Sequence, residues 1–455
     1  MNPSFHIIDF VIVGIYAILL VGVGLWVSRT KKGHTKTAED YFLASKALPW
    51  WAIGSSLIAA NISAEQFIGM SGSGFAGGLA IASYEFMAAL TLIIVGKFFL
   101  PIFIKQGIYT IPEFVEKRFS TNLKTILAVF WIALFVFVNL TSVLFLGGKA
   151  IDTIVGVGDG SMIVPAIIAL AIFAAAYSLY GGLSAVAWTD VIQVALLVIG
   201  GIITTLIALH YVTPDGGILN GISHIADAAS DKFDMVLSRD NKEFNNLPGI
   251  YVLIGGLWVA NLYYWGFNQY IIQRTLAAKS LTEAQRGIAF AAFLKMLIPF
   301  IVVIPGIVAW VMYSEDLYGA RSAFEIAGST ALNNDNAYPW LISTFIPVGV
   351  KGLVLAALAA AIVSSLASML NSTSTIFTMD IYKPYINREA SQTKLVNVGR
   401  LTAGIALIIA VCLAPLLGGI DQMFQYIQEY TGLVSPGILA VFLMGLFWKK
   451  ATNKG

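Results

Sequence analysis

The chain has 455 residues, of which 58% are hydrophobic and only 11% are charged, and its net charge is +2. Soluble proteins carry about a quarter charged residues, so this composition excludes an ordinary cytosolic enzyme and a disordered chain, and the single cysteine, Cys412, excludes a disulfide scaffold. The small net charge gives no basis for nucleic acid as a partner, and the solvent that fits the hydrophobic runs is a lipid bilayer.

The hydrophobic runs are long enough to cross a bilayer as helices, which takes about twenty apolar residues. A helix satisfies its own backbone polar groups in lipid, and the short alternating segments of a membrane barrel do not occur. We therefore expect an all-α integral membrane protein with about 11 transmembrane helices. The predicted spans are 7–27, 51–70, 79–100, 125–146, 164–179, 191–209, 250–271, 287–312, 350–379, 401–417 and 423–447.

The connecting segments differ in their content of lysine and arginine. With the N-terminus outside, the inside segments hold nineteen of the 27 basic residues and the outside segments hold six. Cytoplasmic segments are the ones enriched in lysine and arginine. The sequence therefore predicts an outside N-terminus and an inside C-terminus for this chain.

The ten spans after 7–27 divide into two sets of five, 51–209 and 250–447. Because five is odd, the second set enters the membrane with the opposite orientation, as in an inverted-repeat transporter, whose broken helices form a midplane site. The first span of each set is interrupted by polar residues, at 61–66 and 261–269. Such residues are costly in lipid and mark a substrate or ion pathway, unless they only bond neighbouring helices.

Five hydrogen-bonding side chains on five spans reach a similar depth, in the outer half of the membrane. They are Gln66, Glu85, Asn261, Lys295 and Gln428. One carboxylate, one ammonium and three amides suit a neutral polyol, whose hydroxyl groups both donate and accept hydrogen bonds. Glu85 and Lys295 could instead form a structural ion pair. Aromatic side chains that could stack on a sugar, close gates or only pack are Tyr84, Tyr264 and Phe424.

Small residues share one face of the span 350–379 at positions i, i+3, i+4 and i+7, namely Ala361, Ser364, Ser365 and Ser368. They form either a packing stripe or, with backbone carbonyls freed at a broken helix, an all-oxygen cage that suits Na⁺ rather than a divalent ion. Asp190, at the predicted inner mouth of its span, either passes the ion on or caps the helix.

Three motifs carry a family resemblance over essentially the whole chain. The segments 61–69 (NISAEQFIG), 180–190 (YGGLSAVAWTD) and 364–368 (SSLAS) resemble the sodium/solute symporter family, and its sugar-transporting branch fits best. The resemblance implies a LeuT-type core of 5+5 inverted repeats. It also implies secondary active symport by alternating access, in which sodium drives uptake of galactose or glucose with one Na⁺ per sugar. No enzymatic activity and no organic cofactor are implied.

The resemblance also assigns roles to particular residues. The implied sugar ligands are Gln66, Glu85, Asn261, Lys295 and Gln428, supported by Asn61 and Glu65. The implied outer gate consists of Met70, Tyr84 and Phe424, with Tyr264 as the inner gate beneath the sugar. The implied sodium ligands are the carbonyls of Ala59, Ile62 and Ala361 and the hydroxyls of Ser364 and Ser365, and Asp190 would lie on the ion's exit route.

Two features depart from the pattern that the resemblance leads us to expect. Ala88 stands one turn after Glu85, where galactose-transporting relatives are expected to have serine, and the chain stops at Gly455, where relatives are expected to continue with further helices. The expected location is a bacterial inner membrane, and no oligomeric state is predicted. The alternatives are a sodium symporter of an amino acid, organic acid or vitamin, a non-transporting sugar sensor and, with no nucleophile–base pair in view, a membrane enzyme.

Overall fold

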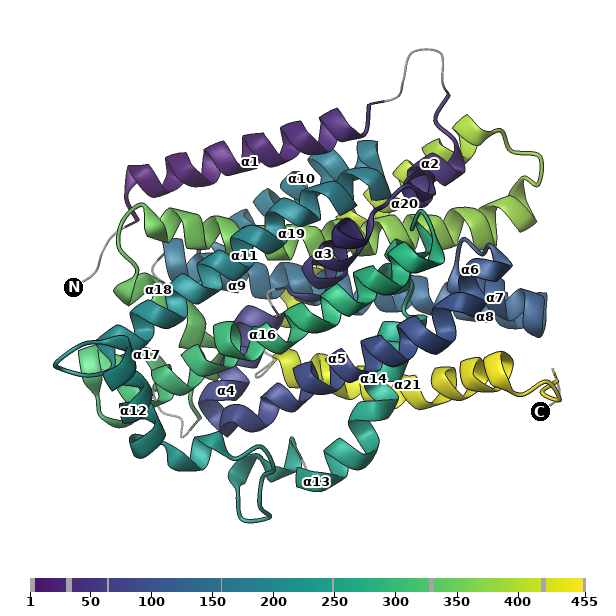
Figure 1. Ribbon diagram of the computed structural model, residues 1–455. Helices are drawn as coiled ribbons and strands as arrows, with labels where there is room; N and C mark the ends of the chain where they lie inside the picture. The colour runs from purple at the N-terminus through teal and green to yellow at the C-terminus, as the bar shows by residue number, and fades with distance from the viewer. Residues whose placement is uncertain are drawn as a thin grey trace.

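The computed structural model describes residues 5–29, 35–63, 65–156, 158–247, 249–326, 331–418 and 423–452, with the backbone alone for Glu65 and 423–426. These residues form helices that run side by side as a bundle (Figure 1). The part of the chain so described contains no β-strand, only isolated bridges between Leu48 and Ala278 and between Glu325 and Leu332. The all-α class predicted from hydropathy is confirmed.

The α-helices have the following bounds. In the first half they are α1 (Ile7–Val27), α2 (Ala38–Phe42), α3 (Trp50–Asn61), α4 (Ser71–Gly77), α5 (Ser83–Ile94), α6 (Leu100–Gln106), α7 (Ile111–Arg118), α8 (Thr121–Ala133), α9 (Thr141–Val155), α10 (Ile163–Gly181) and α11 (Leu183–Tyr211). In the second half they are α12 (Ile218–Ala228), α13 (Gly249–Tyr251), α14 (Leu257–Phe267), α15 (Gln269–Leu276), α16 (Leu281–Ser314), α17 (Ala320–Phe324), α18 (Ala337–Phe345), α19 (Val350–Ile376), α20 (Gln392–Leu413) and α21 (Met423–Phe447).

Ten helical runs within the described residues are long and apolar enough to cross a membrane, and they match ten of the eleven predicted spans. The remaining predicted span, 51–70, is absent from this set because its helix is broken. α3 ends at Asn61, Ile62 has an extended backbone with ψ 104°, and a π-helical turn begins at Glu65. The polar interruption predicted in this span is therefore a real break in the helix.

The first span of the second set is also broken, but further along the chain than its first polar residue. α14 continues to Phe267, Asn268 is extended with ψ 123°, and α15 starts at Gln269. Asn261 stays helical, and its side-chain amide donates to the carbonyl of Leu257 one turn earlier, at 3.0 Å. The break thus falls at the end of the predicted polar segment.

The helix α19 runs through the centre of the bundle, and 94% of the most apolar part of its run is buried. α11 packs on both α19 and α3, and α3 packs on α16. α3 approaches α16 closely at Gly54, where an added Cβ would lie 2.6 Å from the carbonyl oxygen of Gly287. Small residues let membrane helices pack at short distances, so glycines fix the position of α3 beside α16.

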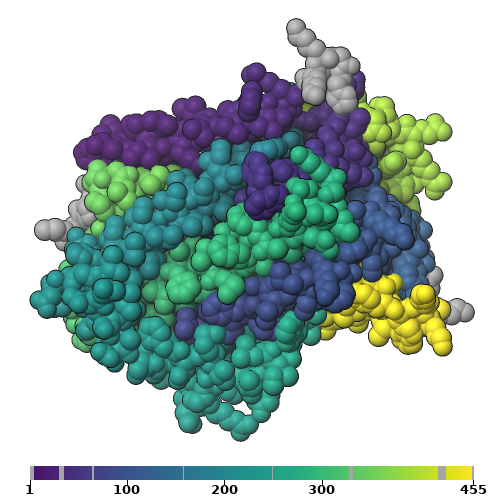
Figure 2. Space-filling model, in the orientation of Figure 1, coloured from purple at the N-terminus to yellow at the C-terminus, as the bar shows by residue number. Residues whose placement is uncertain are grey.

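The N-terminal helix α1 lies along one side of the molecule (Figures 1 and 2), and only 17% of its span is buried. Its buried Asp9 joins it to the beginning of α19. The Asp9 carboxylate accepts hydrogen bonds from the backbone N–H groups of Gly349 and Gly352 at 2.7 and 2.8 Å. A carboxylate at a helix N-terminus satisfies free N–H groups and favours the helix dipole, so α1 caps and anchors the central helix.

Candidate functional site

A small polar pocket of about 60 Å³ lies between the two broken helices and α5, α16 and α21. It has room for about two waters, each of which takes about 30 Å³ in the liquid. Five elements far apart in sequence contribute its lining residues. They are Asn61, Gln66, Met70, Tyr84, Glu85, Ala88, Ala260, Asn261, Tyr264, Trp265, Lys295, Gln428 and Thr431. The five hydrogen-bonding side chains that the sequence singled out therefore meet in one place.

An ion pair forms one wall of the pocket. Lys295 Nζ on α16 lies 2.5 Å from Glu85 Oε2 on α5, and the two side chains are 1% and 3% exposed. The ammonium also lies 5.3 Å from the ring centroid of Trp265. Isolated charges this deep in a membrane protein are costly, so each residue supplies the counter-charge of the other and both still face the pocket.

The amide side chains are held by neighbours, which leaves some polar atoms for a ligand. Trp265 Nε1 donates to Asn261 Oδ1 at 3.2 Å. Asn61 Nδ2 donates to the hydroxyl of Tyr264 at 2.9 Å, while Asn61 Oδ1 is buried and has no hydrogen-bond partner among the described residues. A buried acceptor without a partner costs about 1–3 kcal/mol, so a donor that enters the pocket gains a hydrogen bond there.

Gln66 is held by the helix break itself. Its Oε1 accepts from the Ser63 backbone N–H at 3.2 Å and faces the Ser63 hydroxyl at 3.5 Å. The Gln66 side chain is buried at the edge of the pocket. The break that interrupts α3 therefore also orients one of the five predicted side chains.

The gate residues predicted from the resemblance fall into two groups. Met70, Tyr84 and Tyr264 line the pocket, and the rings of Tyr264 and of Tyr270 on α15 pack edge to face. The side chain of the fourth gate residue, Phe424, lies outside the described residues, as does that of Glu65, which is predicted to support the sugar ligands.

Backbone carbonyls near the break in α3 are released from their helical partners. In a continuous helix, Ser63 N–H would bond the Ala59 carbonyl, but it donates to Gln66 Oε1 instead. The carbonyl of Ile62 loses its partner in the same way, because the N–H of Gln66 bonds the Ser63 carbonyl. Both released carbonyls belong to the predicted sodium set.

The predicted hydroxyl ligands on α19 are fully buried. Ser365 Oγ donates to the carbonyl of Ala60 at 3.0 Å, and Ser364 Oγ donates to Asp190 Oδ1 at 2.5 Å. Ala361 lies one turn before Ser365 and is also buried. The serine stripe therefore forms polar contacts between α19, α3 and α11, and the two hydroxyl oxygens keep lone pairs for a cation.

Asp190 is not a helix cap. α11 begins at Leu183 with Gly182 as its N-cap, so Asp190 lies inside the helix and is fully buried. Its second oxygen accepts from Ser56 Oγ on α3 at 2.5 Å. Hydropathy suggested a helix that begins at the apolar run after Asp190, which would leave Asp190 at its end. The capping alternative is wrong because the helix begins earlier, at Leu183.

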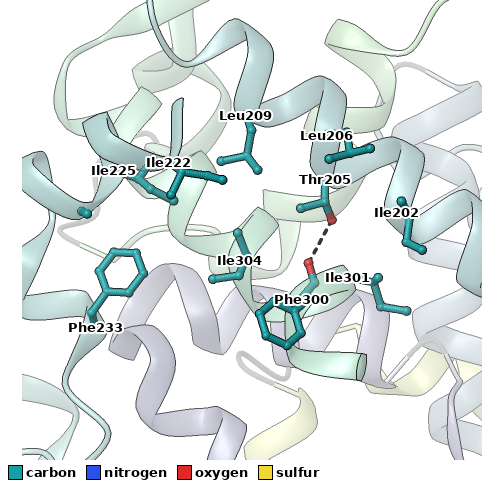
Figure 3. A pocket seen from close by; sticks show the side chains of 11 residues that line it. Ile202, Thr205, Leu206, Leu209, Ile222, Ile225, Phe233, Phe300, Ile301 and Ile304 are labelled. Atoms are coloured by element: carbon teal, nitrogen blue, oxygen red, sulfur yellow. Dashed lines mark hydrogen bonds between the residues drawn. The ribbon is translucent and has the colours of Figure 1, made fainter. Parts of the chain in front are cut away.

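Two further cavities lack the chemistry of the polar pocket. Figure 3 shows an apolar one of about 390 Å³ between α11, α12 and α16, where Thr205 is already bonded to the carbonyl of Phe300 at 3.1 Å. A wider cavity of about 800 Å³ lies beside the segments 231–243 and 331–335 and is lined by charges of both signs, among them Asp231, Lys232 and Lys242. Neither one brings buried amides and an ion pair together.

The comparisons with known proteins decide the family. The model of the Sodium:solute symporter family matches residues 41–455. The chain belongs to this family. The symporter is 67% identical over 451 residues to the sodium/glucose cotransporter of Vibrio parahaemolyticus, and the match covers 98% of this chain and 82% of that protein. This finding confirms the family resemblance of the three motifs.

More distant relatives and a solved structure agree. The symporter is 33% identical to the sodium/myo-inositol cotransporter of Canis lupus familiaris, and it spans 65% of that protein's length. A substrate-bound, outward-open structure of a Na⁺-coupled sialic acid symporter superposes with a TM-score of 0.83 at 27% identity, covering 99% of this chain and 89% of that one. The relatives are cotransporters, so the symporter is a transport protein and not an enzyme.

Some residues of the site were missed from the sequence. Trp265 and Thr431 line the pocket beside predicted residues, and their positions one turn after Asn261 and three residues after Gln428 are the signal that could have indicated them. Arg274 lies between the predicted spans 250–271 and 287–312 and is thus one of the nineteen basic residues of the inside segments, but it is fully buried within α15. Hydropathy gives no signal for it, because its partners lie on other helices.

Proposed function

We propose that this symporter couples sodium entry to the uptake of a monosaccharide, galactose or glucose, by alternating access. The observation that carries the proposal is the polar pocket, where a buried ion pair and amides from both halves of the chain surround a small cavity. Donors and acceptors without net charge match a ring of hydroxyl groups. The 67% identity to a sodium/glucose cotransporter supports the same substrate class.

In this proposal, the sugar hydroxyls bond the pocket side chains, with Tyr264 beneath the ring and Met70, Tyr84 and Phe424 above it. The proposed ligands are Gln66, Glu85, Asn261, Lys295 and Gln428, supported by Asn61 and Glu65. Asn61 Oδ1, which has no hydrogen-bond partner in the part of the chain that the structure describes, supports it, because a sugar hydroxyl can act as the donor. Ala88 also lines the pocket, so we propose that its lack of a hydroxyl affects which sugar is preferred.

The proposed sodium site lies where α19 meets the break after α3. Its ligands are the carbonyls of Ala59, Ile62 and Ala361 and the hydroxyls of Ser364 and Ser365, with Asp190 on the exit route. The released carbonyls and the buried hydroxyls support this assignment, since a monovalent hard cation suits neutral oxygen ligands. One sodium per sugar is the proposed stoichiometry.

We further propose the inverted-repeat boundaries 51–209 and 250–447, and a plasma-membrane location with the N-terminus outside. Two supports are the helix breaks in the first span of each set and the basic inside segments. A cysteine placed in each connecting segment of a Cys412→Ser background, labelled from one side of the membrane, tests the orientation.

Uptake of labelled galactose into proteoliposomes tests the function. We expect an inward sodium gradient to drive accumulation, and replacement of sodium by choline to abolish it. Uptake that is unchanged in choline contradicts the sodium coupling. Binding without uptake in either salt would instead identify a sensor.

Counterflow with a panel of unlabelled competitors tests the substrate class. We expect galactose and glucose to compete, with myo-inositol included because relatives at 33% identity are sodium/myo-inositol cotransporters. Competition by an amino acid, an organic acid or a vitamin, and not by sugars, contradicts the sugar assignment.

A further inference from the structure

The short helix α15 is an unusually polar element for its depth. Every residue of its eight-residue stretch, Gln269–Leu276, is buried. Four of its side chains make polar contacts outside the helix. Gln269 Oε1 accepts from the N–H of Ile111 at 2.8 Å, and Gln273 Nε2 donates to the carbonyl of Phe42 at 2.7 Å. The other two are Tyr270 and Arg274.

Arg274 leads from α15 to the proposed sodium site through a continuous set of contacts. Its Nε donates to Ser56 Oγ at 2.7 Å and to the Ser56 carbonyl at 3.1 Å, and its Nη2 donates to Ser368 Oγ. Ser56 Oγ in turn donates to Asp190 Oδ2, and Ser364 Oγ donates to Asp190 Oδ1, both at 2.5 Å. The guanidinium itself lies 3.8 Å from Asp190.

A second set of contacts leads from α15 to the pocket. The hydroxyl of Tyr270 donates to the hydroxyl of Tyr264 at 2.6 Å, and Asn61 Nδ2 donates to that Tyr264 oxygen at 2.9 Å. α15 therefore touches both proposed sites through side chains one turn apart, Tyr270 and Arg274. It also lies on the side of the basic loops, where Leu48 pairs with Ala278 just after the helix ends.

We propose that α15 is part of the inner gate and that Arg274 is a positioning residue. Through Arg274, the occupied sodium site holds α15 in its closed position against α3 and α19. The inference rests on the proposed function, because it takes Ser364 as a sodium ligand. A serine oxygen that binds Na⁺ must point its O–H away from the ion, and Asp190 is the acceptor in place. With sodium bound, both Asp190 oxygens therefore accept hydrogen bonds, one from Ser364 and one from Ser56. Arg274 then keeps its own hydrogen bonds to Ser56 and Ser368.

When the ion leaves, the Ser364 hydroxyl is free to turn away from Asp190. The carboxylate then lacks one donor in a buried setting, and the nearest charge that can compensate it is the guanidinium 3.8 Å away. Direct pairing draws Arg274 from Ser56 and Ser368, which loosens α15 from α3 and α19. Sodium release and opening of the inner gate are linked in this way, as coupling requires.

Hydrogen exchange of the amides in 269–276, measured on the full chain in nanodiscs with sodium or choline chloride, tests this inference. In the unaltered protein we expect sodium to slow exchange at least about fivefold, the lower end of usual coupling strengths. In Arg274→Gln, exchange is faster and the sodium effect is lost. Ser56→Ala is a smaller change, and we expect it to reduce the sodium effect. If Arg274→Gln does not fold, the result for Ser56→Ala tests the inference.

Gln273→Ala is the matched control. Gln273 is adjacent, equally buried and bonded to Phe42, Thr375 and Ser372, but it has no contact with Asp190. We expect faster exchange in this variant with the sodium effect kept. If Arg274→Gln or a folded Ser56→Ala keeps the full sodium effect, the inference is overturned. If sodium changes neither exchange nor uptake in the unaltered protein, the proposed function itself has failed.

Discussion

At the scale of single residues, the ion pair between Glu85 and Lys295 could have a structural role, a role in sugar binding, or both, and substitution distinguishes these roles. Both side chains are almost fully buried and face the pocket. Removing one partner of a buried pair leaves an uncompensated charge and costs about 3–5 kcal/mol, whereas replacing both partners by neutral residues is often tolerated. The two outcomes can therefore be told apart by single and double substitution.

We predict that Lys295→Met lowers both thermal stability and galactose binding, because Glu85 is left alone in a low-dielectric site. The double variant Lys295→Met with Glu85→Gln should recover most of the stability and still bind galactose at least about tenfold more weakly, a loss of about 1.4 kcal/mol. Thermal unfolding and equilibrium binding in detergent measure the two effects. Binding at full strength in the double variant would leave the pair a purely structural role.

Lys36 is a second residue with a testable charge. Its ammonium donates to the carbonyls of Tyr180 and Gly181 at 3.3 and 3.2 Å, at the end of α10. Burial first, and then the nearby charge of Arg400, lower the pKa of Lys36 to about 8. In the unfolded chain a lysine titrates at about 10.4. Between these values the unfolded state holds a proton that the folded state has released, so stability rises with pH.

We therefore predict that the melting temperature of the unaltered protein rises relative to that of Lys36→Met between pH 8 and pH 10. The variant cannot titrate at this position, so the comparison cancels the other groups. Differential scanning fluorimetry in detergent at matched ionic strength measures it. A difference that stays constant or falls over this range contradicts the lowered pKa.

At the scale of elements, the breaks and caps of helices place the functional groups. The extended backbone at Ile62 releases carbonyls at the end of α3, where Ser365 of α19 bonds the Ala60 carbonyl, and the extended Asn268 separates α15 from α14. The N-terminus of α19 is held by Asp9 from a helix that is otherwise largely exposed. The central helix thus depends on α1 at one end and on polar contacts from α15 at the other.

We predict that Asp9→Ala destabilises the protein by about 1–2 kcal/mol, the usual cost of losing a helix cap, because two N–H groups of α19 lose their acceptor. Asp227→Ala, an exposed aspartate on α12, is the control and should have little effect. The free energy of unfolding from denaturant titration in detergent provides the measurement. Equal stability of the two variants would show that the cap is not needed.

At the scale of the whole molecule, the pocket is too small for its proposed substrate in the conformation described. Its volume of about 60 Å³ is far below the roughly 300 Å³ at the lower end of ligand pockets. Sugar binding therefore requires the helices around the pocket to separate, and alternating access supplies such a change. A ligand shifts conformations only through different affinities for them.

We predict a reciprocal coupling between sodium and galactose. Saturating sodium should strengthen galactose binding by the same factor by which saturating galactose strengthens sodium binding, since both act on one equilibrium. Calorimetric titration of each ligand, with and without the other, measures both factors. Factors of one would contradict the coupling, and since linkage requires the two factors to be equal, their agreement checks the two titrations against each other.

The sequence by itself determined the features that depend on solvent and on local pattern. Hydropathy predicted ten continuous helices and the location of the broken span 51–70, and the polar segment from Asn61 predicted the break. The five pocket side chains could be selected because polar groups stand out in apolar runs, and their depth follows from the helical rise. The symporter family followed from the three motifs.

Only the tertiary structure decided which groups are partners. Arg274 lies 218 positions from Ser56, and Ser364 lies 174 positions from Asp190. In the sequence, a charged residue at the end of an apolar run cannot be distinguished from a charged residue in a loop. Its partners lie on helices that are distant in sequence and come near only when the helices pack. For this reason Arg274 was placed in a loop and Asp190 at a helix mouth, whereas the fold buries both between α3, α11, α15 and α19.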